Sequence, residues 1–217
     1  MPPMSPPVTS VPPLAPQAVH VWRIPLHVSP ECRAACQTLL SADELARAAR
    51  FHFPEHQRRY TVARGFLRSL LECYLEGMNA AQLRFTYGPA GKPALDGLHF
   101  NVAHSGDWAL IAVAKEQAVG VDLEQVRMLD YAAVGRHVLA AEDLMALTRA
   151  PAEQKAAAFF RLWTRHEARL KAAGAALGQP ARPEIPAYDL DAPPTHCAAL
   201  ATLITRPEIR LLDAGAA

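Results

Sequence analysis

The sequence predicts an α+β protein whose chain forms two similar halves, over residues 18–114 and 115–217. Helical patterns and short strands that alternate apolar and polar residues occur in both halves. Because the strands are short and follow one another through tight turns, antiparallel sheets are expected. The likeness lies in the order of elements, since no internal repeat can be aligned. Seven prolines within residues 1–17 predict a disordered or extended tail.

The first half is expected to hold a strand, two helices and three further strands. A Ser-x-x-Glu capping box at Ser41 and Glu44 begins the first helix, and Pro54 begins the longer second one. Turns at 106–107 and 115–118 predict an antiparallel meander that continues into the second half. The expected elements cover residues 19–24, 41–50, 54–76, 84–87, 98–103 and 108–114.

The second half is expected to begin with a strand and to end with two short strands after a proline-rich loop region. Helical patterns fill the part between them. The expected elements are a strand at 119–124, helices near 131–138, 140–148 and 151–173, loops at 180–194, and strands near 197–204 and 208–213.

Composition argues against two kinds of partner. With 51% apolar residues, 20% charged residues and a net charge of +1, the chain has no overall field for nucleic acid or a membrane surface. No apolar run approaches the roughly 20 residues of a membrane span, and the N-terminus lacks a signal-peptide pattern. We therefore expect a cytoplasmic protein. The four cysteines lack the spacing of a zinc site, so reduced thiols are expected.

Two acids share one face of the strand at 119–124. Side chains alternate along a strand, so Asp122 and Glu124 point to the face opposite the intervening valine and leucine. Gly120 leaves space on the acidic face, which suits the close approach of a ligand. The alternative is a solvated face of an edge strand.

A third acid lies on the helix at 151–173. Trp163, Glu167 and Lys171 are spaced at i, i+4 and i+8, which is one helix face. Taken alone, Glu167 and Lys171 are a routine helical ion pair. If Glu167 faces the strand acids, three oxygen ligands converge beside a lysine, which is the outline of a magnesium–phosphate site.

Further polar segments could bind phosphate. His104 lies where a strand ends in a small-residue turn, and its ring and nearby amides could hold a phosphate, or it is an ordinary strand-end histidine. Ser105 beside it lacks the G-x-S-x-G elbow of serine hydrolases. Lys92 lies in a glycine-containing loop that departs from the P-loop pattern. The Arg58-Arg59 pair is either surface charge or a grip on a phosphomonoester.

Together these segments resemble the 4′-phosphopantetheinyl transferase superfamily, specifically its larger, surfactin type. The family's hydrophobic-Gly-hydrophobic-Asp signature is matched at 119–122 and extends to Glu124. Its Trp-x-x-Lys-Glu-Ala-x-x-x-Lys signature is matched by the segment from Trp163 to Lys171. The resemblance covers about residues 19–215. The other matching segments are 51–68, 91–93 and 101–106.

The resemblance implies two helix-plus-antiparallel-sheet halves related by a pseudo-twofold axis, with coenzyme A bound between them. It implies three Mg²⁺ ligands, which are Asp122, Glu124 and Glu167, and catalytic roles for Glu167, Lys171 and His104. The residues implied for coenzyme binding are His104 and Lys171 at the diphosphate, Lys92 and Pro93 at the adenine, and Arg59 with Arg47 at the 3′-phosphate.

The implied reaction moves 4′-phosphopantetheine from coenzyme A to a serine of an apo acyl or peptidyl carrier protein and releases 3′,5′-ADP. Glu167 is the expected base, acting directly or through a metal-bound water. Both halves lie in one chain, so a monomer is expected.

Two positions depart from the family pattern, and two other functions compete. His166 replaces the usual lysine, and Ala103 replaces a common serine. A histidine at position 166 could donate to a phosphate when protonated or in the right tautomer. One competing function is a non-catalytic module that binds coenzyme A or a carrier protein. The other is a metal-dependent phosphohydrolase, which would release phosphopantetheine to water.

Overall fold

The computed structural model describes residues 7–75, 77–88, 91–175 and 182–214. Its helices are α1 (Pro30–Leu39), α2 (Ala42–Ala49), α3 (Pro54–Tyr74), α4 (Tyr131–Val138), α5 (Ala141–Arg149) and α6 (Lys155–Ala173), with 3₁₀ turns at Ala80–Gln82 and Ala152–Gln154. Its strands are β1 (Ala18–Pro25), β2 (Thr86–Tyr87), β3 (Pro93–Ala94), β4 (His99–Ser105), β5 (Trp108–Ala114), β6 (Val119–Gln125), β7 (Ala187–Leu190), β8 (His196–Thr202) and β9 (Glu208–Asp213). No described helix is long and apolar enough to cross a membrane.

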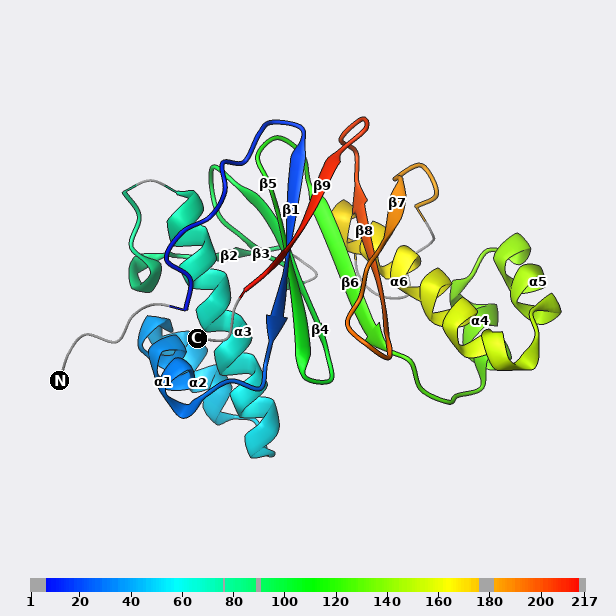
Figure 1. The fold of residues 1–217 in the computed structure, drawn as a ribbon, viewed down its shortest axis with the longest axis horizontal. Coiled ribbons are helices and arrows are strands. Elements are labelled where there is room, and N and C mark those ends of the chain that lie inside the picture. The colour runs from blue at the N-terminus through cyan, green and yellow to red at the C-terminus, as the bar shows by residue number, and fades with distance from the viewer. Residues whose placement is uncertain (1–6, 76, 89–90, 176–181, 215–217) are drawn as a thin grey trace.

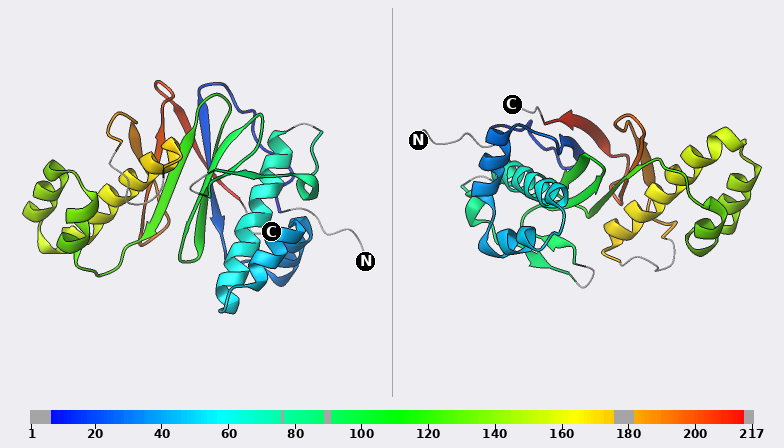
Figure 2. Two further views of the ribbon diagram at one scale, coloured as in Figure 1. Left: turned by 180° about the vertical axis from the view of Figure 1, so that it is seen from behind. Right: turned by 90° about the horizontal axis from the view of Figure 1, so that it is seen from below.

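The elements form layers across an elongated molecule, with α1 to α3 at one end and α4 and α5 at the other (Figures 1 and 2). The first sheet has the strand order β4-β5-β1-β9, and the second has the order β6-β8-β7. Helix α3 covers the outer face of the first sheet, and α6 packs on the second. The expected mixture of helices and sheets is confirmed.

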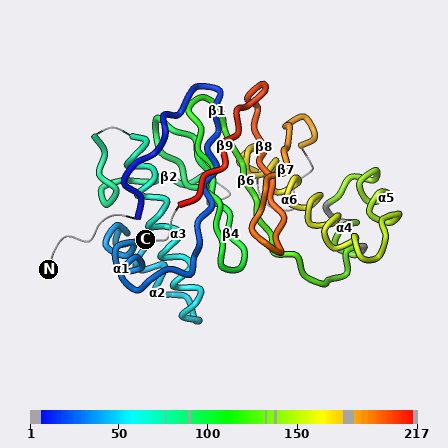
Figure 3. The backbone as a smooth tube through the Cα atoms, in the orientation of Figure 1, coloured from blue at the N-terminus to red at the C-terminus, as the bar shows by residue number. Residues whose placement is uncertain are grey.

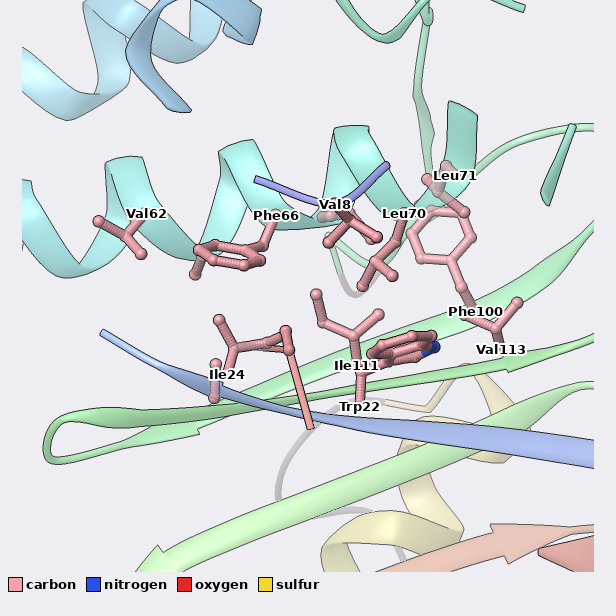
Figure 4. Packing of buried hydrophobic residues seen from close by; sticks show 14 of the residues in the cluster. Val8, Trp22, Ile24, Val62, Phe66, Leu70, Leu71, Phe100, Ile111 and Val113 are labelled. Atoms are coloured by element: carbon pink, nitrogen blue, oxygen red, sulfur yellow. The ribbon is translucent and has the colours of Figure 1, made fainter. Parts of the chain in front are cut away.

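The core between α3 and the first sheet is apolar because both elements present bulky side chains to it. Figure 4 shows Phe66 and Leu70 of α3 facing Trp22, Ile24 and Ile111 of the sheet. All five side chains are buried. Burial of one such side chain contributes about 1.5–3 kcal/mol, so this layer fixes the first half of the chain.

A second apolar layer joins the two sheets. Val21 of β1 and Leu110 of β5 belong to the same buried cluster as Val121 and Leu123 of β6. The alternation expected for the strand at 119–124 is therefore confirmed, because its apolar face enters this layer. The opposite face of β6 is left for α6.

The predicted meander is wrong at its last step. Strands β4 and β5 do form an antiparallel hairpin, but β6 pairs with β8 in the second sheet. The physical reason is that β5 already has β4 on one side and β1 on the other, so it offers no free edge.

The prediction that both sheets are antiparallel is also wrong in one place. Strand β9 pairs with β1 in parallel and so returns to the first sheet, as Figure 3 shows. The edge of β1 that β5 leaves free is closed by this strand from the end of the chain. Two similar halves related by a twofold axis are not confirmed.

Three elements, α1, β3 and β7, were not predicted, and part of the proline-rich segment is ordered. Helix α1 begins at Pro30, capped by Ser29, and β7 lies within the region expected to be loops. Val8 is buried, and its backbone exchanges hydrogen bonds with the Ser69 hydroxyl at 3.1 and 2.8 Å. A disordered or extended tail over residues 1–17 would not make this contact. Residues 1–6 lie outside the described part of the chain.

Candidate functional site

The polar face of β6 lies directly against α6. A Cβ atom on Gly120 would overlap the carbonyl oxygen of Ala168 and the backbone nitrogen of Ala172. Glycine at this position therefore allows the helix backbone to touch the strand. The interpretation of Gly120 as space for a ligand is wrong, because the helix fills that space.

This close packing brings an acid and a lysine of α6 to the strand acids. The Lys171 amine donates a hydrogen bond of 2.6 Å to Oδ1 of Asp122. Asp122 and Glu167 are buried, with 4% and 6% of their surfaces exposed. Helical spacing puts Glu167 one turn before Lys171 on the same face. The structure therefore brings Lys171 to Asp122, and the convergence of all three acids stays a prediction.

Two carboxylate oxygens in this cluster have no hydrogen-bond partner among the residues that the structure describes. They are Oδ2 of Asp122 and Oε1 of Glu167, and both are buried. A buried charged oxygen without a partner is costly, because it has lost water and gained nothing in return. The pair therefore indicates that the site accommodates another positively charged group.

Glu124 completes the acidic cluster at its more open end. Its Oε2 accepts a hydrogen bond from the Ser105 hydroxyl at 3.3 Å, and the Arg127 guanidinium lies 3.5 Å away. Burial and the nearby Asp122 carboxylate raise the pKa of Glu124. The acid is half-buried, whereas Asp122 and Glu167 are buried.

The donor set fits a hard divalent cation. Among the described residues, no three acid, histidine or cysteine side chains already converge closely enough to hold an ion. Lys171 is instead bonded to Asp122. The two orphaned oxygens are nevertheless carboxylates, which are the ligands that Mg²⁺ prefers. The Asp122 carboxylate helps to raise the pKa of both Glu167 and Glu124, and a cation between these acids would reduce that repulsion.

Burial raises the pKa of Glu167 to about 7, assisted by the Asp122 carboxylate and opposed by the Lys171 amine. This value predicts a pH-dependent stability of the metal-free protein. The folded pKa lies above the ordinary value of 4.5, so the folded state binds more protons than the unfolded state between these values. The contribution of Glu167 to the free energy of unfolding is therefore fully present below about pH 4.5, and it is lost as the pH rises through about 7.

Denaturant unfolding in EDTA measures this effect. Relative to Glu167→Gln, which cannot ionise, the wild type should lose about 3 kcal/mol of unfolding free energy between about pH 5 and about pH 8. Stability curves that run parallel for the two proteins would contradict the assigned environment of Glu167.

Strand β4 carries the other candidate, His104, alongside β6. Asn101 and Ser105 of β4 accept hydrogen bonds of 2.9 Å from the backbone amides of Val121 and Gln125. These bonds join strands of different sheets at the acidic cluster. Asn101 and Ser105 were not predicted as site residues. Asn101 could have been found, because it is a polar residue in the middle of an apolar strand.

A cavity of about 190 Å³ opens beside His104. Arg47 and Pro93 line it together with His104, whose side chain is exposed. Desolvation and the nearby Lys171 and Arg59 cations lower the pKa of His104, so its ring is neutral at pH 7. The structure thus brings three of the predicted coenzyme-binding residues to one cavity.

The lining of this cavity also includes residues that were not among the predicted coenzyme-binding residues. Arg64 and Tyr87 line it and are joined by a hydrogen bond of 2.9 Å from the guanidinium to the hydroxyl. Tyr60 adds an aromatic ring, with the Arg47 guanidinium 5.5 Å from its centre. A second cavity of about 780 Å³ also has Arg47, Tyr60 and Tyr87 in its lining.

Two other predicted residues make contacts within the protein. Arg59 donates a 3.0 Å hydrogen bond to Asp107 and lies 3.6 Å from Glu55. The Lys92 amine donates to the backbone carbonyl oxygens of Val119 and Lys171. Neither side chain is among those that line the cavity beside His104.

Known proteins and family models match the chain over this site. A model described as "4'-phosphopantetheinyl transferase, N-terminal" matches residues 28–116, and one described as "4'-phosphopantetheinyl transferase superfamily" matches residues 118–208. The 4'-phosphopantetheinyl transferase HetI of a Nostoc species is 44% identical over 163 residues, which are 72% of this chain and 68% of HetI. The chain belongs to the 4′-phosphopantetheinyl transferase superfamily.

Two further relatives are less similar to this chain. The 4'-phosphopantetheinyl transferase psf-1 of Bacillus pumilus is 34% identical over 62% of this chain and 58% of psf-1. The 4'-phosphopantetheinyl transferase Sfp of Bacillus subtilis is 26% identical over 66% of this chain and 64% of Sfp. The comparisons confirm the superfamily that the sequence predicted, with Sfp-type relatives in it. They also confirm the predicted enzyme class.

His166 distinguishes this transferase from the family motif. The side chain is buried, with 6% of its surface exposed. Desolvation and the Arg169 cation lower its pKa, so the ring is neutral at pH 7. The carboxylates of the acidic cluster do not contribute to this shift. His166 therefore brings no positive charge to that cluster.

Proposed function

We propose that this transferase takes its phosphopantetheine from coenzyme A, requires Mg²⁺, and modifies a serine of an apo acyl or peptidyl carrier protein. The observation that carries this proposal is the pair of buried, unpartnered oxygens of Asp122 and Glu167 beside the Lys171 amine. Such an arrangement suits a cation and the diphosphate oxygens that accompany it.

The acidic cluster would hold the metal. Asp122, Glu124 and Glu167 are the proposed ligands, and the orphaned oxygens of Asp122 and Glu167 support two of them. Bound there, Mg²⁺ would neutralise the negative charge of the diphosphate. Glu124 would have to turn from Ser105 and Arg127 to take part.

Lys171 and His104 would bind the diphosphate. The Lys171 amine is charged, and its side chain is partly exposed at 29%, so it can reach a ligand as well as Asp122. His104 is neutral and exposed and can donate one ring N–H. These donors would stabilise the charge that grows on the leaving phosphate.

The cavity beside His104 would receive the nucleotide end of coenzyme A. Pro93 would border the adenine, and Arg47 would bind the 3′-phosphate, since both line this cavity. Arg59 would help only by giving up Asp107, which it now contacts. For Lys92 we propose contact with the coenzyme through its backbone, because its amine is bonded elsewhere.

Glu167 is the proposed base for the attacking serine. The serine oxygen forms a bond to the β-phosphorus, the bond to the bridging oxygen breaks, and 3′,5′-ADP leaves. The serine proton passes to Glu167, directly or through a water molecule. We further propose that the enzyme acts as a monomer, because the residues above all lie in one chain. We also propose that it works in the cytoplasm, where its coenzyme and carrier substrates would be found.

Release of 3′,5′-ADP tests the proposal. Coenzyme A and Mg²⁺ should yield 3′,5′-ADP only when an apo carrier protein is present, and a carrier whose acceptor serine is changed to alanine should yield none. Release without carrier would identify a phosphohydrolase. Binding of coenzyme A without release, across several carriers, would identify a non-catalytic module.

A further inference from the structure

The side chain of Lys92 crosses from the first half of the chain to the second. Lys92 directly precedes β3, and its amine donates hydrogen bonds of 2.9 Å to the carbonyl oxygen of Val119 and 2.7 Å to that of Lys171. Val119 begins β6, and Lys171 lies in the last turn of α6. One amine thus joins three elements that are far apart in sequence.

The end of α6 attracts the amine, whereas burial and a neighbouring lysine oppose its charge. The carbonyl end of a helix carries partial negative charge, which attracts a cation. The side chain is half-buried, and desolvation followed by the Lys171 charge lowers the pKa of Lys92 to about 8. The amine is therefore still mainly charged at pH 7, and hydrogen bonds from a charged donor are the stronger kind.

The bonded carbonyls flank the point where α6 touches β6. Gly120, whose missing side chain lets the two backbones meet, follows Val119 directly. Asp122 lies two residues further along β6, and its carboxylate is bonded by the side chain of Lys171. A small shift between α6 and β6 at this point would change the separation of Glu167 from Asp122.

We propose that Lys92 is a positioning residue that holds α6 against β6 and thereby sets the geometry of the acids. This inference rests on the proposed function of those acids. It differs from a role of the amine as a coenzyme contact, although the neighbouring Gly91 and Pro93 line the cavity beside His104.

Three variants test this role. Lys92→Met keeps the length of the side chain and removes its donors, whereas Lys92→Arg keeps donors. Lys115→Met is the matched control, because Lys115 is exposed in the turn between β5 and β6. Amide hydrogen exchange of the metal-free proteins is measured together with kcat and KM for coenzyme A.

In Lys92→Met, the amides of β6 and of the last turns of α6 should exchange at least about tenfold faster, with β5 unchanged. The kcat should fall by roughly 10- to 100-fold while KM for coenzyme A changes by less than about threefold, because misplaced groups slow the chemical step. Lys92→Arg should recover much of both properties, and Lys115→Met should match the wild type.

A different result would overturn the inference. A KM for coenzyme A that rises about tenfold in Lys92→Met, with kcat and amide exchange unchanged, would make the amine a coenzyme contact. If amide exchange in Lys92→Met is accelerated equally in β5 and β6, Lys92 stabilises the whole fold and does not position α6 against β6. If the wild type shows no transfer, the proposed function fails, and the exchange comparison alone decides whether Lys92 holds the two elements together.

Discussion

An Asp122→Ala protein is expected to lose nearly all transfer activity, with a fall in kcat of at least about 10³-fold. Asp122 connects the two elements of the site, because it lies on β6 and accepts a hydrogen bond from Lys171 of α6. Its second oxygen is buried and has no hydrogen-bond partner in the described part of the chain. Alanine would remove a proposed metal ligand and leave the Lys171 amine without its partner. Glu167→Ala is expected to be similarly severe, since it removes a proposed ligand and base.

Asp122→Asn is the sharper variant, because it keeps the shape of the side chain and removes its charge. Steady-state rates and thermal unfolding are measured together, so that a folding defect is separated from a catalytic one. Glu116→Ala is the control, since Glu116 is an exposed acid in the turn before β6. Full activity in Asp122→Ala, at unchanged Mg²⁺ dependence, would refute the metal-site assignment.

Gly120→Ala is expected to lower the free energy of unfolding strongly, although it adds only one methyl group. The new Cβ would overlap backbone atoms of Ala168 and Ala172, which cannot move without shifting α6 from β6. Overpacking of this kind costs about 3 kcal/mol or more, which lowers the melting temperature of a chain of this size by roughly 6–12 °C. Activity should fall as well, because Glu167 and Lys171 move with the helix.

Gly135→Ala provides the comparison. A Cβ at Gly135 of α4 would meet the ends of flexible leucine side chains at 3.2 and 3.3 Å, and these can adjust. This variant should unfold within a few degrees of the wild type. Equal melting temperatures for the two alanine variants and the wild type would show that the contact between β6 and α6 is looser than the structure indicates.

The acidic cluster could be predicted because its signals are local. Alternation along β6 separated Val121 from Asp122, and helical spacing put Glu167 and Lys171 on one face. Apolar packing on the opposite face of β6 then left the acids only one direction to point. Helix boundaries set by caps and prolines, such as the beginnings of α2 and α3, were predicted for the same reason.

Features that depend on distant pairing could not be predicted. Whether β6 joins β5 or β8 is decided by which strand edges remain open once the whole chain is folded, and the sequence near 115–118 does not record this. The return of β9 to β1, the backbone contact at Gly120 and the reach of Lys92 are of the same kind. Burial of Val8 depends on a serine 61 residues away.

Intact mass of an apo carrier protein, incubated with this transferase, coenzyme A and Mg²⁺, tests the central claim most directly. Parallel samples contain EDTA, or the Asp122→Asn variant in place of the wild type. The account predicts a gain equal to one phosphopantetheine group with the wild type, and no gain in either parallel sample. A gain of the same size in EDTA, or with Asp122→Asn at the wild-type rate, would contradict it.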